Sequence, residues 1–152
     1  MTEIVVYTAG TWDLFHKGHL NLIRKSKMYG GKLIVGVSTD ELVFSYKRIK
    51  PFISFEERFE IIQSLKYVDL AVRQTKLIDI EHLKLFNVDV VTIADSWKGK
   101  YIEGIDWMSK QENKFVVYLQ YTKGISSSII RERIVKEYLK NKKKDGRGDN
   151  FG

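Results

Sequence analysis

His16 and His19 lie three residues apart on either side of Gly18, and no other spacing in the chain has so clear a chemical meaning. An apolar run typical of a buried parallel strand precedes them at residues 4–7, and a helix-like stretch follows at residues 20–29. The histidines are therefore expected where a strand leads into a helix, where free backbone N–H groups and the helix dipole bind anions. Gly18 would let a phosphate approach the backbone closely. Two imidazoles directed at one phosphate indicate nucleotide chemistry.

Histidines with this spacing could also be structural, or they could bind a metal ion. The chain has no cysteine, and His82 is its only other histidine, so a closed zinc site lacks ligands. No acidic cluster dedicated to a metal is evident in the sequence. On the residues alone, a structural role and a phosphate-directed role both stay open.

Strand-like and helix-like segments alternate along the rest of the chain. Ser54 and Glu57 have the spacing of a capping box at the start of a helix, whose apolar face predicts core residues. Strands are expected at residues 4–7, 32–37, 70–72, 89–93 and 115–119, a turn at 38–40, and helices at 20–29, from 54, at 78–86 and from 126; the core face comprises Phe55, Phe59, Ile62 and Leu65. This order predicts a single α/β domain, Rossmann-like, with a doubly wound parallel five-stranded sheet.

The carboxyl ends of parallel strands meet at one edge of such a sheet, and ligands bind there. Four polar segments follow strands: the histidine segment and residues 46–50, 94–100 and 121–128. The last of them contains three consecutive serines, of which Ser126 suffices to cap the final helix. The surplus hydroxyls are predicted to bind phosphate oxygens, and the four segments are predicted to form one site.

Composition gives the frame for this site. The chain has 152 residues, 43% of them hydrophobic, with one proline, which predicts one compact domain. It begins with an acidic segment rather than a leader, and nothing approaches the roughly 20 apolar residues of a membrane span. The absence of cysteine excludes disulfides and fits a reducing compartment. We expect a cytoplasmic protein.

The formal net charge is +7, and part of it is concentrated near the C-terminus. Residues 140–152 hold five basic side chains against two acidic ones. We expect a folded domain at residues 1–139 and a basic, flexible tail at residues 140–152. The positive body suits an enzyme that handles anionic substrates. Specific nucleic-acid binding is the less favoured interpretation.

Residues 10–19, with the sequence G-T-W-D-L-F-H-K-G-H, resemble the signature G-T-F-D-L-x-H-x-G-H of the cytidylyltransferase family. Residues 121–128 are similar to the family's second signature, R-T-x-G-I-S-T-T, which wraps the nucleotide triphosphate. Together these segments extend the resemblance over residues 3–134. Adenylyl-transferring relatives tend to carry a proline where this chain has Leu14, so the resemblance points to cytidylyl transfer.

The resemblance implies transfer of a cytidylyl group from CTP to a phosphorylated alcohol, with release of pyrophosphate. The strings W-x-G-K at residues 97–100 and Y-V-D at 67–69 look most like the branch that acts on glycerol 3-phosphate, so CDP-glycerol is the implied product. The implied catalytic residues are His16, His19 and Lys47, with Lys47 and Lys76 toward the acceptor. The implied nucleotide-binding residues are Thr11, Trp12, His16, Lys17, Gly18, His19, Lys50, Asp95, Trp97, Tyr121, Thr122, Lys123, Gly124, Ile125, Ser126, Ser127 and Ser128.

The chemistry needs no general base. A phosphomonoester has a second pKa near 6 and is mostly dianionic at neutral pH. The protein must bring two anions together and stabilise the charge that develops as pyrophosphate leaves. Mg²⁺ is expected to be carried mainly by CTP. The family's habit implies a homodimer with residues 67–69 near the contact.

Two departures from the family pattern bear on the substrate. Tyr121 stands where the second signature has arginine, so one cation for the triphosphate is missing, and Lys123 and Lys66 are candidates to replace it. The family's G-D-D-W has become A-D-S-W at residues 94–97. Two alternatives stay open: an ATP-using adenylyltransferase of the flavin or pantetheine type, and a non-catalytic protein that binds nucleotides or nucleic acid.

Overall fold

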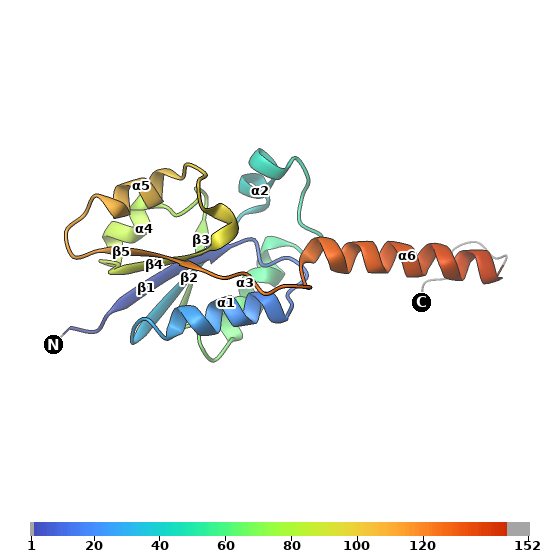
Figure 1. The fold of residues 1–152 in the computed structure, drawn as a ribbon, viewed down its shortest axis with the longest axis horizontal. Helices are drawn as coiled ribbons and strands as arrows, with labels where there is room; N and C mark the ends of the chain where they lie inside the picture. Colours follow the sequence, from blue (N-terminus) through green and yellow to red (C-terminus); the bar gives the residue numbers. More distant parts are fainter. Residues whose placement is uncertain (1, 146–152) are drawn as a thin grey trace.

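The computed structural model describes residues 2–145 and shows one parallel sheet between two layers of helices (Figure 1). The spatial order of the strands is β3-β2-β1-β4-β5, which confirms the predicted doubly wound fold. The strands are β1 (Val5–Gly10), β2 (Lys32–Ser38), β3 (Leu70–Gln74), β4 (Val90–Ala94) and β5 (Phe115–Leu119). The helices are α1 (Lys17–Lys27), α2 (Asp40–Lys47), α3 (Phe55–Ser64), α4 (Ile80–Leu85), α5 (Glu103–Ser109) and α6 (Ser127–Asp145), with a 3-10 turn, η1 (Asp95–Trp97).

The strands are apolar on both sides because helices cover both faces of the sheet. Val6 and Leu33 pack toward α1 and α3 in one cluster, which also holds Ile23 and Ile62. Their neighbours Tyr7 and Ile34 point the other way, into a second cluster with residues of α4 and α5. Figure 1 shows these two helix pairs on opposite sides of the sheet. The packing fixes the strand ends, from which the polar segments start.

Two helix starts agree with the sequence. Ser54 Oγ accepts from the N–H of Glu57 and caps α3, and Ser126 Oγ accepts from the N–H of Ile129 at the start of α6. The predicted core face of α3 is also confirmed, with Ile62 fully buried and the three other predicted residues packed against the first cluster.

Helices α2 and α5 were not predicted. The segment 38–40, expected as a turn, starts α2, whose first turn is capped by Thr39 Oγ. Val43 is the one buried residue of α2, so this short helix has no apolar stripe for periodicity to detect. Helix α5 begins without a side-chain cap at Ile102. The basic stretch at residues 46–50 is consequently the last turn of α2 and the loop after it.

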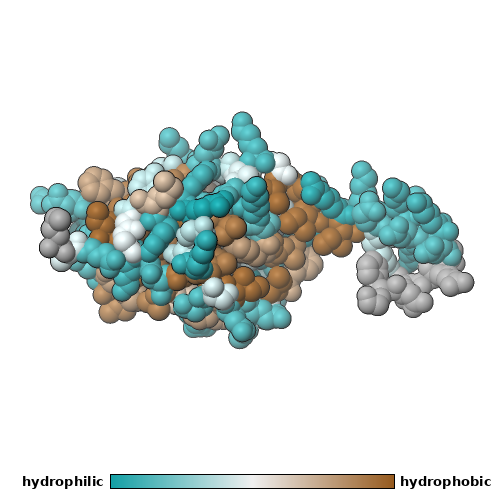
Figure 2. Space-filling model, turned by 90° about the horizontal axis from the view of Figure 1, so that it is seen from below, coloured by the Kyte–Doolittle hydropathy of each residue, from teal (hydrophilic) through white to brown (hydrophobic). Residues whose placement is uncertain are grey.

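Helix α6 leaves the body of the molecule and projects away from it (Figure 1). None of its residues is buried, and Ile134, Val135 and Leu139 are each more than half exposed. Seen from below, apolar side chains gather where α6 leaves the body, and hydrophilic ones cover its far end (Figure 2). The predicted domain boundary at residue 139 falls inside this helix, and residues 146–152 of the predicted tail lie outside the described part. No helix within residues 2–145 has both the length and the apolar character needed to cross a membrane.

Candidate active site

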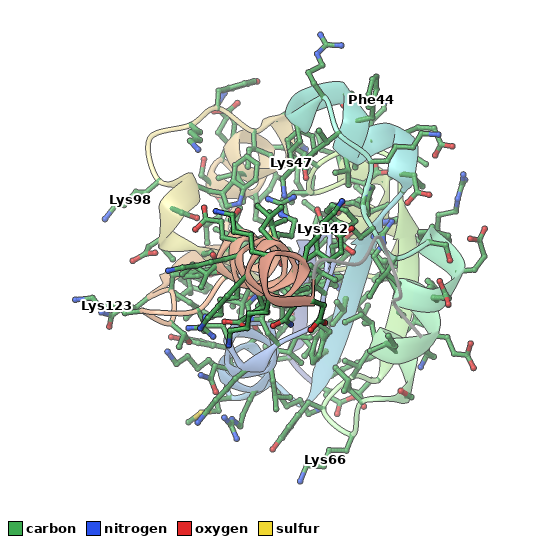
Figure 3. The ribbon with its side chains drawn as sticks, turned by 90° about the vertical axis from the view of Figure 1, so that its right-hand side faces the viewer. Phe44, Lys47, Lys66, Lys98, Lys123 and Lys142 are labelled. Carbon is green, nitrogen blue, oxygen red and sulfur yellow. The ribbon has the colours of Figure 1, made fainter. Side chains whose placement is uncertain are left out.

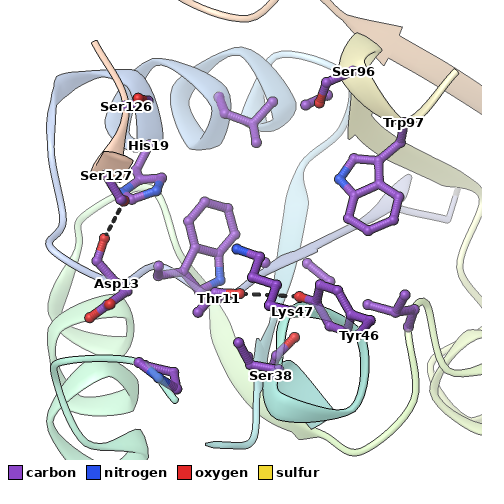
Figure 4. A pocket seen from close by; sticks show the side chains of 18 of the residues that line it. Thr11, Asp13, His19, Ser38, Tyr46, Lys47, Ser96, Trp97, Ser126 and Ser127 are labelled. Atoms are coloured by element: carbon purple, nitrogen blue, oxygen red, sulfur yellow. Dashed lines mark hydrogen bonds between the residues drawn. The ribbon is translucent and has the colours of Figure 1, made fainter. Parts of the chain in front are cut away.

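A cleft of about 450 Å³ lies over the carboxyl ends of the strands, and all four predicted polar segments contribute to it (Figure 4). The chain runs from β1 outward to β2 and β3, then crosses to β4 on the other side of β1. The strand order therefore reverses between β1 and β4, and open α/β sheets bind ligands at this point. The volume is in the range of small-molecule sites.

The structure brings some of the predicted site residues together and leaves others outside. Those that line the cleft are Thr11, Trp12, His19, Lys47, Lys50, Trp97, Tyr121, Ser126, Ser127 and Ser128. Those that do not line it are His16, Lys17, Gly18, Lys76, Asp95, Thr122, Lys123, Gly124 and Ile125.

Three of the residues outside the cleft hold its walls. Asp95 Oδ1 accepts from the N–H of Tyr121, which joins η1 to the segment after β5. Thr122 Oγ1 accepts from Asn21 Nδ2 of α1. A Cβ on Gly18 would lie 2.8 Å from the ring of His16 and 3.4 Å from Ile125, so only glycine fits there without a shift.

The two histidines form a reciprocal cap on α1. His16 is the N-cap residue, and its Nδ1 accepts from the N–H of Gly18 at 3.0 Å. His19 Nδ1 accepts from the N–H of His16 at 3.3 Å, and the rings stack with centroids 3.8 Å apart. A neutral imidazole that accepts at Nδ1 carries its hydrogen on Nε2. The backbone therefore fixes one tautomer for both rings, with Nε2–H as the donor.

Both rings are neutral at physiological pH. Burial, followed by His16 and Lys47, lowers the pKa of His19 to about 3. Burial also lowers the pKa of His16. His19 lies on the cleft wall, whereas His16 Nε2 is buried and is the one such side-chain atom in residues 2–145 without a hydrogen-bond partner. The pair can offer hydrogen bonds to phosphate oxygens, and the positive charge must come from other residues.

Acid is expected to destabilise the fold through these histidines. Unfolded histidines titrate near pH 6.5, whereas folded His19 stays neutral down to about pH 3. Between these values the unfolded chain binds more protons than the folded one. The free energy of unfolding therefore decreases as the pH is lowered, by about 1.4 kcal/mol per pH unit for each extra proton. Urea unfolding of wild type and His19→Gln from pH 7 to 4.5 measures this effect. The variant should decline less steeply, and equal slopes would contradict the assignment.

The loop between β1 and α1 is strained where it enters the cleft. Trp12 and Leu14 both have positive φ, at 60° and 48°, a conformation uncommon for bulky residues. Trp12 Nε1 donates to the carbonyl of Gly36 on β2 at 3.0 Å, and its indole meets the His19 ring edge to face. The larger ring that replaces the family phenylalanine thus anchors the loop and packs behind His19.

Asp13 joins three segments around the cleft. Its carboxylate accepts from the N–H groups of Phe52 and Ile53, each at 2.9 Å, and its carbonyl accepts from Ser127 Oγ at 2.7 Å. The loop after α2 and the start of α6 are therefore tied to the segment after β1. Ser127, one of the serines predicted to bind phosphate, therefore donates its hydroxyl hydrogen to Asp13.

Arg58 of α3 binds several of the segments that surround the cleft. It was not among the predicted site residues. It is fully buried, and its guanidinium donates to the carbonyls of Ile53, Thr11 and Ser38 at 2.6–2.9 Å. It also pairs with Asp40 Oδ1 at 2.6 Å. A charged residue within the apolar stripe of α3 was the sequence signal for it. Arg58 fixes the ends of β1 and β2 and the start of α2.

Three cationic side chains line the cleft: Lys47, Lys50 and Arg131. The Lys47 ammonium points into the cleft (Figure 4), and desolvation first, then repulsion from Arg131, lowers its pKa. Arg131 lines the cleft one turn into α6, with Nη2 2.9 Å from Ser128 Oγ. Arg131 thus brings a cation to the same cleft as Tyr121, which stands where the family has arginine. Lys66 and Lys123, the expected replacements, lie at the outer edge of the molecule and do not line the cleft (Figure 3).

The arrangement suits an anionic ligand rather than a metal ion held by protein alone. Within residues 2–145, no three His, Asp or Glu side chains are grouped so as to hold a metal. The neutral donor of His19, three cations and the N-terminus of α6 all contribute to the cleft. Trp97 and Tyr46, with ring centroids 6.1 Å apart, give another part an aromatic surface. This is the site expected of an α/β protein that binds a nucleotide.

Comparison with known proteins agrees with this class. A sequence model described as cytidylyltransferase-like matches residues 7–133. The chain therefore belongs to the cytidylyltransferase-like family. The glycerol-3-phosphate cytidylyltransferase of Bacillus subtilis (strain 168) is 38% identical over 139 residues, covering 88% of this chain and 98% of that protein. The enzyme of the same name from Staphylococcus aureus is 35% identical over 133 residues, covering 85% and 93%. A solved lipopolysaccharide core biosynthesis protein from Thermoplasma volcanium has a TM-score of 0.66 at 25% identity, covering 80% of this chain and 100% of that one.

Proposed function

We propose that the protein transfers a cytidylyl group from CTP to glycerol 3-phosphate, forming CDP-glycerol and pyrophosphate. One observation carries the proposal: the neutral, tautomer-fixed His19 donor and the cations Lys47 and Arg131 line one cleft at the strand-order reversal. The similarity to glycerol-3-phosphate cytidylyltransferases along most of the chain supports the choice of substrates.

The reaction follows from these groups. The dianionic acceptor phosphate attacks the α-phosphorus of CTP, a P–O bond forms, and the bond to the bridging oxygen of pyrophosphate breaks. Charge grows on the α-phosphate oxygens, where fixed Nε2–H donors stabilise it without reorganising. Lys47 screens the repulsion between the two anions, and Arg131 with the start of α6 binds the leaving phosphates.

Release of pyrophosphate from CTP and from ATP, each with glycerol 3-phosphate, tests the proposal. We expect turnover with CTP and at least tenfold less with ATP. Faster turnover with ATP would favour the adenylyltransferase alternative. Nucleotide binding without turnover on any phosphorylated alcohol would favour a non-catalytic protein.

Lys47→Ala is expected to raise the KM for glycerol 3-phosphate by about tenfold or more, because an ionic contact to the acceptor phosphate is lost. The KM for CTP should change much less. Initial rates at varied concentrations of each substrate measure both. Lys76→Ala is the comparison: Lys76 is exposed and outside the cleft, so its effect should be smaller. An equal rise in the KM for CTP would move Lys47 to the nucleotide side.

Arg131→Met is expected to weaken CTP binding by about ten- to hundredfold, the usual loss for one charge-assisted hydrogen bond. Arg133→Met on the same helix is the matched control, because Arg133 is exposed and does not line the cleft. Titration calorimetry with CTP measures both variants. Unchanged affinity in Arg131→Met would leave the triphosphate without its proposed cation.

Three further proposals accompany this function. Mg²⁺ would enter with the nucleotide, whose phosphate oxygens are its preferred ligands.

A homodimer is proposed from the family, although Val68 is buried in the core and Asp69 binds Lys27 and the N–H of Leu33 within the chain. Sedimentation at several protein concentrations tests the dimer. The cytoplasmic location stays a prediction.

A further inference from the structure

A buried chain of hydrogen bonds runs through the sheet to the floor of the cleft. His82 Nδ1 on α4 lies 3.2 Å from the Tyr7 hydroxyl, which donates to Gln74 Oε1 at 2.7 Å. Gln74 Nε2 in turn donates to Ser38 Oγ at 3.3 Å. Tyr7, Gln74 and Ser38 are essentially inaccessible to water on their own strands, yet Gln74 and Ser38 both line the cleft.

The Tyr7–Gln74 bond gives this chain a direction when His82 has its hydrogen on Nδ1. Tyr7 has one hydrogen and gives it to Gln74, so His82 in that tautomer donates to Tyr7. Because Gln74 Oε1 accepts from Tyr7, the NH₂ group of the amide turns toward Ser38. Ser38 Oγ accepts, so its own hydrogen is free to be donated onward. The chain therefore ends at the cleft in an oriented hydroxyl and an oriented amide.

These two groups lie in the half of the cleft formed by β2 and β3, on the side of β1 away from β4 and β5. Ser38 and Gln74 are register partners at the carboxyl ends of β2 and β3, whereas the strand order reverses between β1 and β4. Ser38 lies beneath Lys47 and Tyr46 in Figure 4. Their neighbours in the lining, Val43, Leu77 and Ile78, are apolar. A ligand whose phosphate meets Lys47 would extend an uncharged end over this floor.

We propose that Ser38 and Gln74 recognise the free hydroxyl groups of the acceptor alcohol and so determine its identity. Tyr7 and His82 are positioning residues that orient the Gln74 amide. This inference rests on the proposed transfer to glycerol 3-phosphate and names the part of the cleft that selects it. Gln74 Oε1, Gln74 Nε2 and Ser38 Oγ already have partners within the chain. A primary amide has two hydrogens and a hydroxyl one, so the second N–H of Gln74 and the O–H of Ser38 are the donors that the substrate hydroxyls would meet.

The test compares acceptors that differ by one hydroxyl. Wild type, Gln74→Leu and Ser38→Ala are assayed with CTP and with glycerol 3-phosphate, 3-hydroxypropyl phosphate or 2-hydroxypropyl phosphate. Gln63→Leu is the matched control, since Gln63 also bonds β3, at the N–H of Ala71, but lies outside the cleft. Circular dichroism checks folding, and Ser38→Ala, which removes one hydroxyl, covers the case in which Gln74→Leu does not fold.

Wild type and Gln63→Leu should prefer glycerol 3-phosphate to at least one analogue by about tenfold or more in kcat/KM, because that analogue leaves a buried polar group unpaired. In Gln74→Leu or Ser38→Ala this preference should shrink to about threefold or less, with little change in the KM for CTP. Variants that keep the wild-type preference, or that slow equally on all three acceptors, would overturn the inference. Wild type without turnover of glycerol 3-phosphate would instead overturn the proposed function.

Discussion

His19→Ala is expected to lower kcat with CTP and glycerol 3-phosphate by about 10²–10³-fold. The substitution removes one Nε2–H donor from the place where negative charge develops, and losses of this size follow removal of a single such donor. His16→Ala should also slow turnover, because the His16 ring stacks on the ring of His19 and holds it in place. It should also cost about 1 kcal/mol of stability, because His16 Nδ1 caps α1. Steady-state rates at saturating substrates measure the effect.

Two further variants separate catalysis from structure at this site. His19→Gln keeps an amide donor near the position of Nε2 and should recover part of the lost rate. Lys25→Ala changes an exposed residue of the same helix and should turn over as the wild type does. If both alanine variants kept kcat within threefold of wild type, the histidines would be helix caps only.

Arg58→Met is expected to reduce the free energy of unfolding by about 3–5 kcal/mol. The substitution keeps a long side chain but leaves three carbonyls and the carboxylate of Asp40 without their donor. Breaking a buried charge pair from one side costs this much, because the partner groups stay behind unpaired. Urea unfolding gives the value.

The matched control removes only the ion pair. Asp40→Asn keeps an oxygen acceptor for Arg58, and the Asp40 side chain is already 31% exposed, so a loss of about 1 kcal/mol or less is expected. If Arg58→Met were as mild as Asp40→Asn, the bonds to the backbone carbonyls would contribute little. The ends of β1 and β2 would then be held by strand packing alone.

The strands and the longer helices could be predicted because one physical pattern controls each. A parallel sheet covered on both sides requires unbroken apolar runs, such as β2, and Ser54 and Ser126 have the residue types of helix caps. Helices α2 and α5 could not be found in this way. They are short, with one buried residue in α2 and two in α5, so too few apolar positions recur for the helical period to be detected.

Some residues of the candidate site could also be predicted from the sequence, and others could not. The two signature loops could be placed at the cleft because they follow predicted strands, and His19, Tyr121 and the three serines of these loops line it. Arg58, Arg131, Ser38 and Gln74 were missed because their importance depends on side chains distant in sequence. Conversely, Lys76 and Lys123 follow predicted strands but do not line the cleft. Position after a strand brings a residue to the correct edge, and only packing decides which way its side chain points.

The reciprocal histidine cap places position 16 under two opposed demands. Serine, threonine, aspartate and asparagine are the strongly preferred N-cap residues, so an aspartate at position 16 would hold the first turn of α1 well. It would also bring a negative charge beside an incoming phosphate and remove the Nε2 donor. Selection of variants for heat resistance alone should therefore drift away from histidine at this position, and selection for turnover should restore it. The residue at position 16 that stabilises α1 most is therefore not the residue that gives the highest catalytic rate.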